Sequence, residues 1–304
     1  MRILVTGGSG LVGSAIKELI QTSNSISNNE YINNEYLFIS SKDYDLTKYD
    51  QTMLCFDKFK PDIVIHLASI VQGAISGSDT QYRSLIDNCN ININVFDACS
   101  NYNVKKIITT LSVVLSEKEN NVDEASIIKG PVLELRFHQG YTHSKRLLHY
   151  LAVSYQKANK GHVVLLTPVN IYGYQDIAHS NRIIPSLIKK CMNEKKINFG
   201  VDSARQLLYN NDIASIIIRF IMASNELFIE SSLKPYIIGN PEVLTIKEIV
   251  DTITPKMNIP AETIEYNNDT FSRIVNVSPL PFDFKYTSFR DGFAEVWDNY
   301  CKKM

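Results

Sequence analysis

The chain opens with MRILVTGGSGLVG (residues 1–13), in which a short apolar run is followed at once by glycines. The run 3–5 predicts a buried strand, Gly7, Gly10 and Gly13 give the pattern G-x-x-G-x-x-G, and apolar residues at helical spacing begin at Leu11. A strand, a glycine turn and a helix in this order are typical of a dinucleotide-binding unit, because the turn lets a pyrophosphate approach the helix N-terminus. A purely structural tight turn is the alternative.

The composition is that of an ordinary globular chain. Its 304 residues are 44 % hydrophobic and 21 % charged, with a net charge of -1. This balance gives no broad attraction to nucleic acid or to an anionic membrane, and no apolar run reaches membrane-spanning length. The five cysteines are odd in number and lack metal-ligand spacing, so we expect reduced thiols, a cytoplasmic location and no metal.

Strands and helices alternate through the first half of the chain. After the first strand, further strands are predicted at 36–39, 63–67, 106–110 and 162–166, with helices between them. This spacing predicts an α/β fold with a doubly wound parallel sheet of the Rossmann type. We expect a dinucleotide-binding domain at 1–167 and, mainly at 168–304, a smaller, interleaved α/β substrate lobe. Some later segments are expected to return to the first domain.

The second half predicts helices and little else. They are expected at 182–193, 212–223, 245–256 and 288–300. Thr245 and Glu248 form a capping box, which marks the start of the third of these helices.

Tyr141 and Lys145 form the motif Y-x-x-x-K, which places a phenol and an ammonium group on one helix face. A cation there favours the phenolate, so that the tyrosine can exchange a proton with a carbonyl or hydroxyl oxygen. Ser112 ends a predicted central strand, at the sheet edge where ligands bind. A solvated helix face is the ordinary explanation for Y-x-x-x-K alone, but Ser112 and the glycine turn favour a reductase site.

These motifs resemble those of the GDP-L-fucose synthases, which are extended short-chain dehydrogenases/reductases. The stretches that carry the resemblance include FISSKDYDLT, PDIVIHLAS, GYTHSKR, TPVNIYG and ARQLLYNNDIA, and they cover nearly the whole chain. The resemblance implies reduction of a GDP-linked 4-keto-6-deoxy sugar. It also implies a homodimer formed by the helices at 82–100 and 141–157.

The turn after the second strand bears on the choice of cofactor. An NAD enzyme usually places an acid there for the ribose hydroxyls, whereas Ser40, Ser41 and Lys42 offer hydroxyls and a cation. This favours the 2′-phosphate of NADPH, and a plain polar turn is the alternative. With the resemblance, the predicted cofactor-binding residues are Gly7, Gly10, Leu11, Val12, Gly13, Ser40, Ser41, Lys42, Asp45, Leu46, Leu67, Ala68, Ser69 and Lys145.

The resemblance also implies the catalytic and substrate-binding roles. Ser112 and Tyr141 are expected to hold the C4 carbonyl oxygen, with Tyr141 as proton donor and Lys145 bound to the nicotinamide ribose. Asn170 is expected to contact the substrate. Arg205 is expected to bind the substrate diphosphate, which suits a guanidinium fork.

Two substrate-binding positions depart from the family pattern. The family's synthases also epimerise C3 and C5, with a cysteine as base two residues after the serine and a histidine as acid. Val114 stands at the cysteine position and Arg182 at the histidine position. Valine accepts no proton, and arginine is a poor acid because its pKa exceeds about 12. We therefore hypothesise a C4 reductase that has lost epimerase activity.

Three alternatives stay open on the sequence alone. The first is the bifunctional epimerase/reductase, with His179 or a water molecule in the vacant place. The second is a reductase or dehydratase of a UDP- or dTDP-sugar, because the glycine turn and Y-x-x-x-K do not determine which nucleotide base the substrate carries. The third is a non-catalytic NADP-binding regulatory protein. The sequence also leaves the sugar open between a hexose and a heptose.

Overall fold

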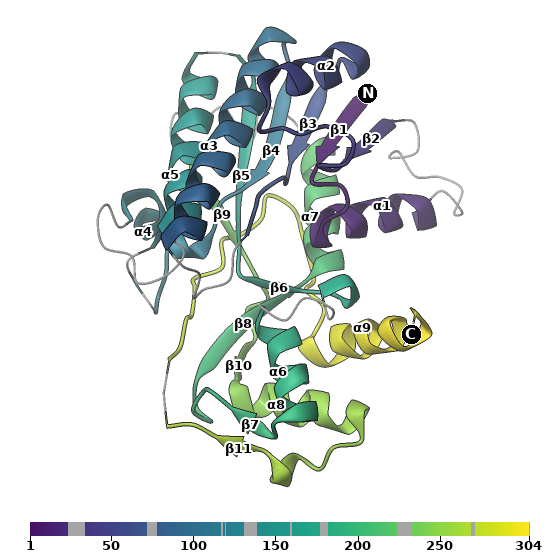
Figure 1. Cartoon of the computed structure of the whole chain (residues 1–304), viewed down its shortest axis with the longest axis vertical. Helices are drawn as coiled ribbons and strands as arrows, with labels where there is room; N and C mark the ends of the chain where they lie inside the picture. Colours follow the sequence, from purple (N-terminus) through teal and green to yellow (C-terminus); the bar gives the residue numbers. More distant parts are fainter. Residues whose placement is uncertain are drawn as a thin grey trace.

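The computed structural model describes residues 1–23, 34–71, 78–116, 118, 120–130, 139–158, 160–176, 182–223, 233–268 and 271–303. A six-stranded sheet with the order β2-β1-β3-β4-β5-β9 forms its centre, and all neighbouring strands are parallel (Figure 1). The strands are β1 (Arg2–Thr6), β2 (Glu35–Ile39), β3 (Ile63–His66), β4 (Lys106–Thr110), β5 (His162–Pro168) and β9 (Tyr236–Ile238). The inner strands are buried apolar runs, as parallel strands covered on both faces must be.

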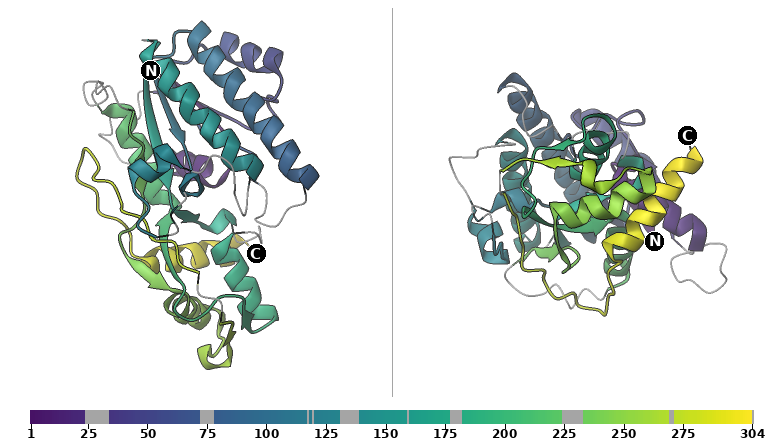
Figure 2. Two further views of the ribbon diagram at one scale, coloured as in Figure 1. Left: turned by 90° about the vertical axis from the view of Figure 1, so that its left-hand side faces the viewer. Right: turned by 90° about the horizontal axis from the view of Figure 1, so that it is seen from below.

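Helices cover both faces of this sheet (Figures 1 and 2). On one face α1 (Leu11–Ser23) packs against α7 (Asn210–Met222), and on the other α3 (Ser78–Asn101) lies beside α5 (Gln139–Lys157), with α2 (Tyr49–Phe59) next to α3. The chain passes from β1 to β2 and then reverses toward β3, so right-handed crossovers place helices on opposite faces. The predicted doubly wound α/β fold is confirmed. Its ligand crevice is expected at the carboxyl ends of β1 and β3.

A smaller lobe lies beyond the carboxyl ends of the sheet (Figure 1). One of its sheets has the order β10-β8-β6, and the other pairs β11 with β7. A second apolar core joins them to the lobe's helices. The elements are β6 (Asn170–Tyr172), α6 (Ile183–Asn193), β7 (Lys196–Ile197), β8 (Ala204–Tyr209), β10 (Val243–Thr245), α8 (Ile246–Ile253), β11 (Glu265–Tyr266) and α9 (Phe289–Lys303).

The chain returns from the lobe to the sheet through α7 and β9. Lys106, at the start of β4, is buried and donates hydrogen bonds to the carbonyl oxygens of Phe220, Ile221 and Ala223 over 3.2, 3.1 and 2.8 Å. These carbonyls lie at the C-terminal end of α7, where a helix leaves acceptors unsatisfied and favours a cation. The ammonium group therefore anchors α7 to the central sheet.

The lobe differs from the sequence prediction in its strands and in one helix end. The short strands β6, β8 and β10 were not predicted. The capping box is present, because Thr245 Oγ1 accepts from Glu248 N over 3.1 Å and Glu248 Oε2 accepts from Thr245 N over 2.8 Å. However, α8 ends at Ile253, and a 3₁₀ turn follows over Thr254–Met257. Pro255 explains the change, since it cannot donate the next helical hydrogen bond.

Candidate active site

The glycine turn connects β1 directly to α1. Gly7 has a φ of 70°, a conformation that favours glycine. Gly8 N donates to the carbonyl oxygen of Ile39 over 2.8 Å, which ties the turn to the end of β2. A Cβ atom on Gly13 would lie 2.5 Å from the carbonyl oxygen of Gly7. The turn therefore requires glycine at these positions. We call the backbone surface that it presents at the N-terminus of α1 the cradle, and free N–H groups there suit a pyrophosphate.

A buried hydrogen-bond network closes the other side of this cradle. His66 Nδ1 lies 2.8 Å from Thr6 Oγ1, and His66 Nε2 lies 3.1 Å from Asn92 Oδ1. Thr6 Oγ1 also accepts from Ala68 N over 3.2 Å. Burial, with a smaller contribution from the charge of Lys145, lowers the pKa of His66 to about 4, so this histidine is neutral.

The network holds residues 67–68 against the turn. A Cβ atom on Gly7 would lie 2.8 Å from Ala68 N. Leu67 and Ala68 therefore border the cradle at the position predicted for cofactor-binding residues. Ser69 follows, and its hydroxyl donates to Asn88 Oδ1 over 3.1 Å.

The predicted 2′-phosphate turn contains a carboxylate that the sequence analysis missed. Asp43 Oδ2 accepts hydrogen bonds from both Ser40 N and Ser40 Oγ over 2.8 Å. These hydrogen bonds, helped by the charge of Lys42, lower the pKa of Asp43. The Ser40 hydroxyl proton is therefore used inside the turn, whereas Ser41 and Lys42 are exposed.

Asp45 and Leu46 form the wall that follows this turn. Asp45 Oδ1 accepts from Thr47 N and Oγ1 over 3.0 and 2.7 Å. The carbonyl oxygen of Leu46 accepts from Asn94 Nδ2 over 3.0 Å, which joins the wall to α3.

Ser112, Tyr141 and Lys145 come together at the carboxyl end of β4. Ser112 begins a 3₁₀ turn (Val113–Leu115), and its Oγ accepts from Val114 N over 3.4 Å. Tyr141 lies in the first turns of α5. Burial raises the pKa of Tyr141 to about 12, whereas a hydrogen bond with Ser112 and the charge of Arg182 act in the opposite direction. The phenol is therefore protonated at neutral pH and can donate to an oxygen.

Lys145 supplies the buried cation of the site. Its ammonium group donates to the carbonyl oxygen of Thr110 over 2.7 Å and lies 5.6 Å from the centroid of the Tyr141 ring. Burial lowers the pKa of Lys145 to about 8. The two residues of the Y-x-x-x-K motif thus belong to one cluster with Ser112, in which the lysine is buried and the tyrosine and serine are half-buried, rather than to a solvated helix face.

The two departures from the family pattern lie near this cluster. Val114 is half-buried, two residues after Ser112. Arg182 precedes α6, and its Nε lies 3.4 Å from Oδ1 of the buried Asp176. The charge of Arg182 acts to lower the pKa of Tyr141. His179, the alternative acid, lies outside the described residues.

Arg205 occupies an aromatic cage at the far end of the site. Its Cζ lies 5.1 Å from the centroid of the Phe199 ring and 5.0 Å from that of Phe271, and the Cζ of Arg273 lies 5.8 Å from the latter. Burial, with a contribution from Arg273, lowers the pKa of Arg205 to about 10. No carboxylate among the described residues forms an ion pair with Arg205.

Arg205 Nη1 also donates to the carbonyl oxygens of Ala204, over 2.7 Å, and of Phe271. The two neighbouring arginines are a candidate site for an anion. Arg205 was predicted from the sequence, whereas Arg273, Phe199 and Phe271 were not, because they belong to no recognisable motif. Asn170, predicted to contact the substrate, lies exposed at the start of β6.

The glycine turn and the Ser112, Tyr141 and Lys145 cluster define an extended short-chain dehydrogenase/reductase. Residues 3–229 match the model of the NAD dependent epimerase/dehydratase family. The chain belongs to this family and is an NAD(P)-dependent oxidoreductase.

The similarity extends to individual proteins. The chain is 30% identical to a GDP-L-fucose synthase from Dictyostelium discoideum over 272 residues, which cover 86% of this chain and 81% of the relative. Among solved structures, a GDP-L-fucose synthetase from Naegleria fowleri bound to NADP has a TM-score of 0.79 at 25% identity, covering 99% of this chain and 93% of that chain. A GDP-mannoheptose C4 reductase from Campylobacter jejuni with NADP bound shares the fold, with a TM-score of 0.81 at 18% identity and coverage of 99% and 98%. The resemblance drawn from the motifs is confirmed.

No group of three or more His, Cys, Asp or Glu side chains that could hold a metal ion occurs in the described part of the chain. None of the helices that the structure describes is both long and apolar enough to cross a membrane. The five cysteines are free thiols, and the cytoplasmic location stays a prediction.

Proposed function

We propose that this protein is an NADPH-dependent C4 reductase of a GDP-4-keto-6-deoxy sugar, a hexose or a heptose, without C3 or C5 epimerase activity. One observation carries the proposal. Ser112, Tyr141 and Lys145 form a complete reductase cluster, while valine and an ion-paired arginine occupy the two positions at which an epimerase would move protons.

The cluster suits the reduction of a ketone. When bound, the cofactor supplies the hydride that forms the new C–H bond at C4. Tyr141 donates its proton to the C4 oxygen as that oxygen gains negative charge. Ser112 already accepts from Val114 N, so its own proton is directed toward an acceptor such as Tyr141 or the substrate oxygen. Lys145 stabilises the tyrosinate left after the transfer.

The same site is poorly suited to epimerisation. Removing a proton from C3 or C5 needs a base beside the ring, and the side chain of Val114 is a hydrocarbon. Arg182 shares its charge with Asp176, and the pKa of an arginine is too high for it to act as an acid near neutrality. Instead, we propose that the guanidinium group donates hydrogen bonds to oxygens of the sugar.

Several features support NADPH as the cofactor. The glycine turn at the N-terminus of α1 suits a pyrophosphate, and exposed Ser41 and Lys42 suit a 2′-phosphate. The negative charge of Asp43 would repel that phosphate, but Oδ2 of its carboxylate accepts two hydrogen bonds from Ser40 within the turn. The Naegleria and Campylobacter structures carry NADP.

The anion site supports a nucleoside diphosphate at the other end of the substrate. Arg205 and Arg273 place two positive charges beside the Phe271 ring. Among the described residues, no carboxylate forms an ion pair with Arg205. Relatives named as GDP-sugar enzymes support guanosine as the base. The heptose reductase among the structural neighbours supports keeping a heptose beside a hexose as substrate.

We also infer a homodimer. Tyr82, Ile86 and Ile93 are exposed on α3 at spacings that place them on one stripe, and Tyr150 is exposed on the adjacent α5. An exposed apolar stripe of this kind marks an interaction site. Light scattering on the purified protein tests the inference, with Ile86→Lys expected to give a monomer.

Reduction in deuterated water tests the proposed activity. The protein is incubated in deuterated water with NADPH and a GDP-4-keto-6-deoxy sugar, without any other enzyme. A parallel series in ordinary water adds a separate epimerase and follows NADPH consumption only. We expect NADPH consumption that Tyr141→Phe abolishes, and a product without deuterium at C3 or C5. Deuterium at either carbon would instead identify the bifunctional epimerase/reductase. Consumption only with UDP- or dTDP-sugars would identify the second alternative, and NADPH binding without turnover the third.

A further inference from the structure

A C-terminal segment, which we call the strap (residues 271–280), runs along the anion end of the site. Arg273 N donates to the carbonyl oxygen of Ala204 over 3.2 Å, and Val275 N donates to Gln206 Oε1 over 2.7 Å. The strap therefore follows the edge of β8, with Phe271 and Arg273 beside Arg205. Any displacement of the strap moves half of the anion site.

The same strap is bonded on its other side to the segment that follows Ser112. Val122 N donates to the carbonyl oxygen of Ile274 over 3.1 Å, and Asn276 N donates to that of Val122 over 2.8 Å. Ser278 Oγ donates to Glu124 Oε1 over 2.6 Å. Glu124 is the first residue of the short helix α4 (Glu124–Lys129), so the strap holds α4 at its start.

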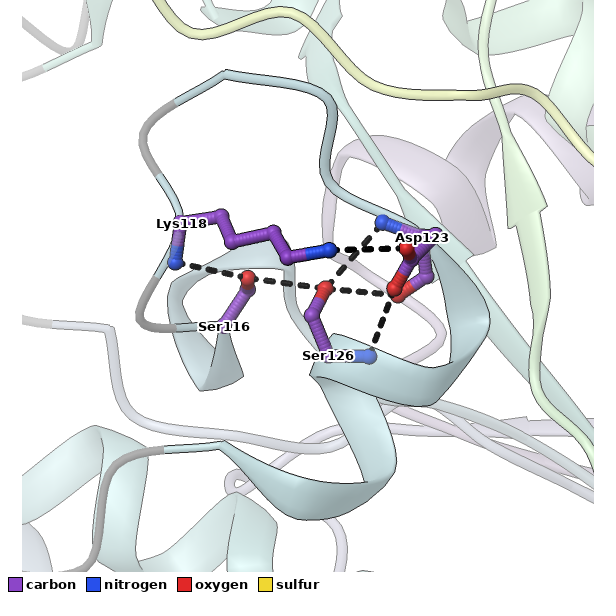
Figure 3. A network of polar contacts seen from close by, with 4 residues as sticks. All are labelled: Ser116, Lys118, Asp123 and Ser126. Carbon is purple, nitrogen blue, oxygen red and sulfur yellow. Dashed lines mark hydrogen bonds and ion pairs between the residues drawn. The ribbon is translucent and has the colours of Figure 1, made fainter.

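Helix α4 is in turn bonded to the turn that begins at Ser112 (Figure 3). Ser116 Oγ donates to Ser126 Oγ over 2.9 Å and accepts from Lys118 N over 3.0 Å. Asp123 caps α4 by accepting from Ser126 N over 2.7 Å, and Lys118 pairs with the same carboxylate over 2.8 Å. Ser116 itself closes the 3₁₀ turn by donating its N–H to Val113 O over 3.2 Å.

A second connection runs to the catalytic helix. Arg146, which follows Lys145 on α5, donates to the carbonyl oxygens of Ile128 and Leu115 over 2.8 and 3.3 Å. The 3₁₀ turn of Ser112, helix α4 and the catalytic helix thus form one hydrogen-bonded frame, and the strap joins this frame to the arginine pair.

We propose that Glu124 and Ser116 are positioning residues that fix the separation between the arginine pair and Ser112, so that binding of the substrate's diphosphate orients its carbonyl at the catalytic cluster. This rests on the proposed function in one respect, namely that Arg205 and Arg273 receive the diphosphate. A substrate that contacts both the arginine pair and the Ser112 cluster is oriented by a rigid frame. Binding energy at the diphosphate then holds the reacting carbonyl in place, which raises kcat. A truncated substrate gains nothing from it.

Kinetics with two substrates test the proposal. One is the GDP-4-keto-6-deoxy sugar, and the other is the matching 4-keto-6-deoxy sugar 1-phosphate, which lacks the second phosphate and the nucleoside. Glu124→Ala and Ser116→Ala should each lower kcat about tenfold on the nucleotide sugar, which corresponds to one hydrogen bond. KM and NADPH affinity should change little, and kcat/KM for the sugar phosphate should be unaffected.

Two variants serve as matched controls. Glu124→Gln keeps an acceptor for Ser278 Oγ and should recover most of kcat, which a general loss of stability would not predict. Lys129→Ala removes an exposed charge from the same helix and should behave as the parent protein. If Glu124→Ala and Ser116→Ala lower kcat/KM equally for both substrates, or lower Tm without changing the kinetics, the proposal is wrong.

Hydrogen exchange separates a failure of this proposal from a failure of the proposed function. If the parent protein reduces no GDP-4-keto sugar, the function is wrong, and GDP alone then serves as the probe. GDP should protect the amides of Val122 and Asn276, and also those of Leu115 and Ser116, in the parent protein. Glu124→Ala should remove the protection at Leu115 and Ser116, and unchanged protection there contradicts the coupling.

Discussion

The ammonium group of Lys145 lies 2.7 Å from the carbonyl oxygen of Thr110, to which it donates a hydrogen bond. This contact fixes a positive charge of α5 at the end of β4, inside the protein. Burial lowers the pKa of Lys145 from 10.5 to about 8, so the folded state binds this proton less tightly than the unfolded state does. The charge that the reaction uses therefore weakens the fold.

Replacing Lys145 by methionine should stabilise the protein while removing its reductase activity. A pKa shift of this size destabilises the folded state by about 3 kcal/mol at pH 7. Losing the hydrogen bond to Thr110 removes about 1 kcal/mol of stabilisation, so the free energy of unfolding should rise by about 2 kcal/mol. The penalty is complete below pH 8 and fades as pH rises toward 10.5, so the gain should shrink over that range. Urea unfolding of both proteins measures it, and a less stable Lys145→Met protein at pH 7 would refute this account.

His66 should make the protein sensitive to acid. Its pKa is about 4 in the folded state and about 6.5 in the unfolded state. The stability that depends on neutral His66 is thus present above pH 6.5 and is lost as pH falls toward 4. At pH 5 the free energy of unfolding should be lower by about 2 kcal/mol than at pH 7. The variant His66→Gln should flatten this part of the profile, and an equally steep profile would assign the sensitivity to other groups.

The turn after β2 should discriminate between the two nicotinamide cofactors. Lys42→Ala removes a cation from the predicted 2′-phosphate site and should raise KM for NADPH about tenfold, with KM for NADH unchanged. Asp43→Asn should act in the opposite direction, because it removes a negative charge while its amide oxygen still accepts from Ser40. Steady-state kinetics with both cofactors measure the effects. If Lys42→Ala changes both KM values equally, the turn does not read the phosphate.

Restoring the two missing proton-transfer groups should restore exchange at the sugar ring. The double variant Val114→Cys with Arg182→His places a thiol and an imidazole beside the Tyr141 cluster. We expect deuterium incorporation at C3 or C5 at a rate about 100-fold or more above that of the parent, since each acid or base contributes on this scale. Mass spectrometry of the recovered sugar measures it. Arg182→His alone is the control and should give no exchange, since no base is present.

Five strands of the central sheet were predictable because each is a short run rich in apolar residues and bounded by glycine, proline or polar residues. The sixth strand, β9, was not predicted, since it has only three residues. The proximity of Ser112, Tyr141 and Lys145 was predictable because these residues follow a strand end or share one helix face. The strands of the lobe were not predicted, since β6 and β10 have three residues each and carry no alternating pattern. Only their pairing with β8 makes them strands.

The environment of Arg205 could not be read from the sequence either. Phe199 lies just before β8, whereas Phe271 and Arg273 come from a segment that the chain reaches much later. Asp176 is likewise an ordinary acidic residue until the fold places it beside Arg182. These relations depend on tertiary packing, and no local spacing encodes them.

The hydrogen bonds between Lys106 and the end of α7 have a consequence for dissecting the molecule. A fragment that stops at residue 167 would contain the Lys106 ammonium group but none of the three carbonyl oxygens that it contacts, and it would also lack β9 beside β5. Such a fragment would leave Lys106 without these acceptors, uncover the face of β4 against which α7 packs, and expose a sheet edge. The lobe is therefore a long insertion within one folding unit. A shortened version of this protein should keep residues 210–222 and 236–238 and remove residues only between β6 and β8.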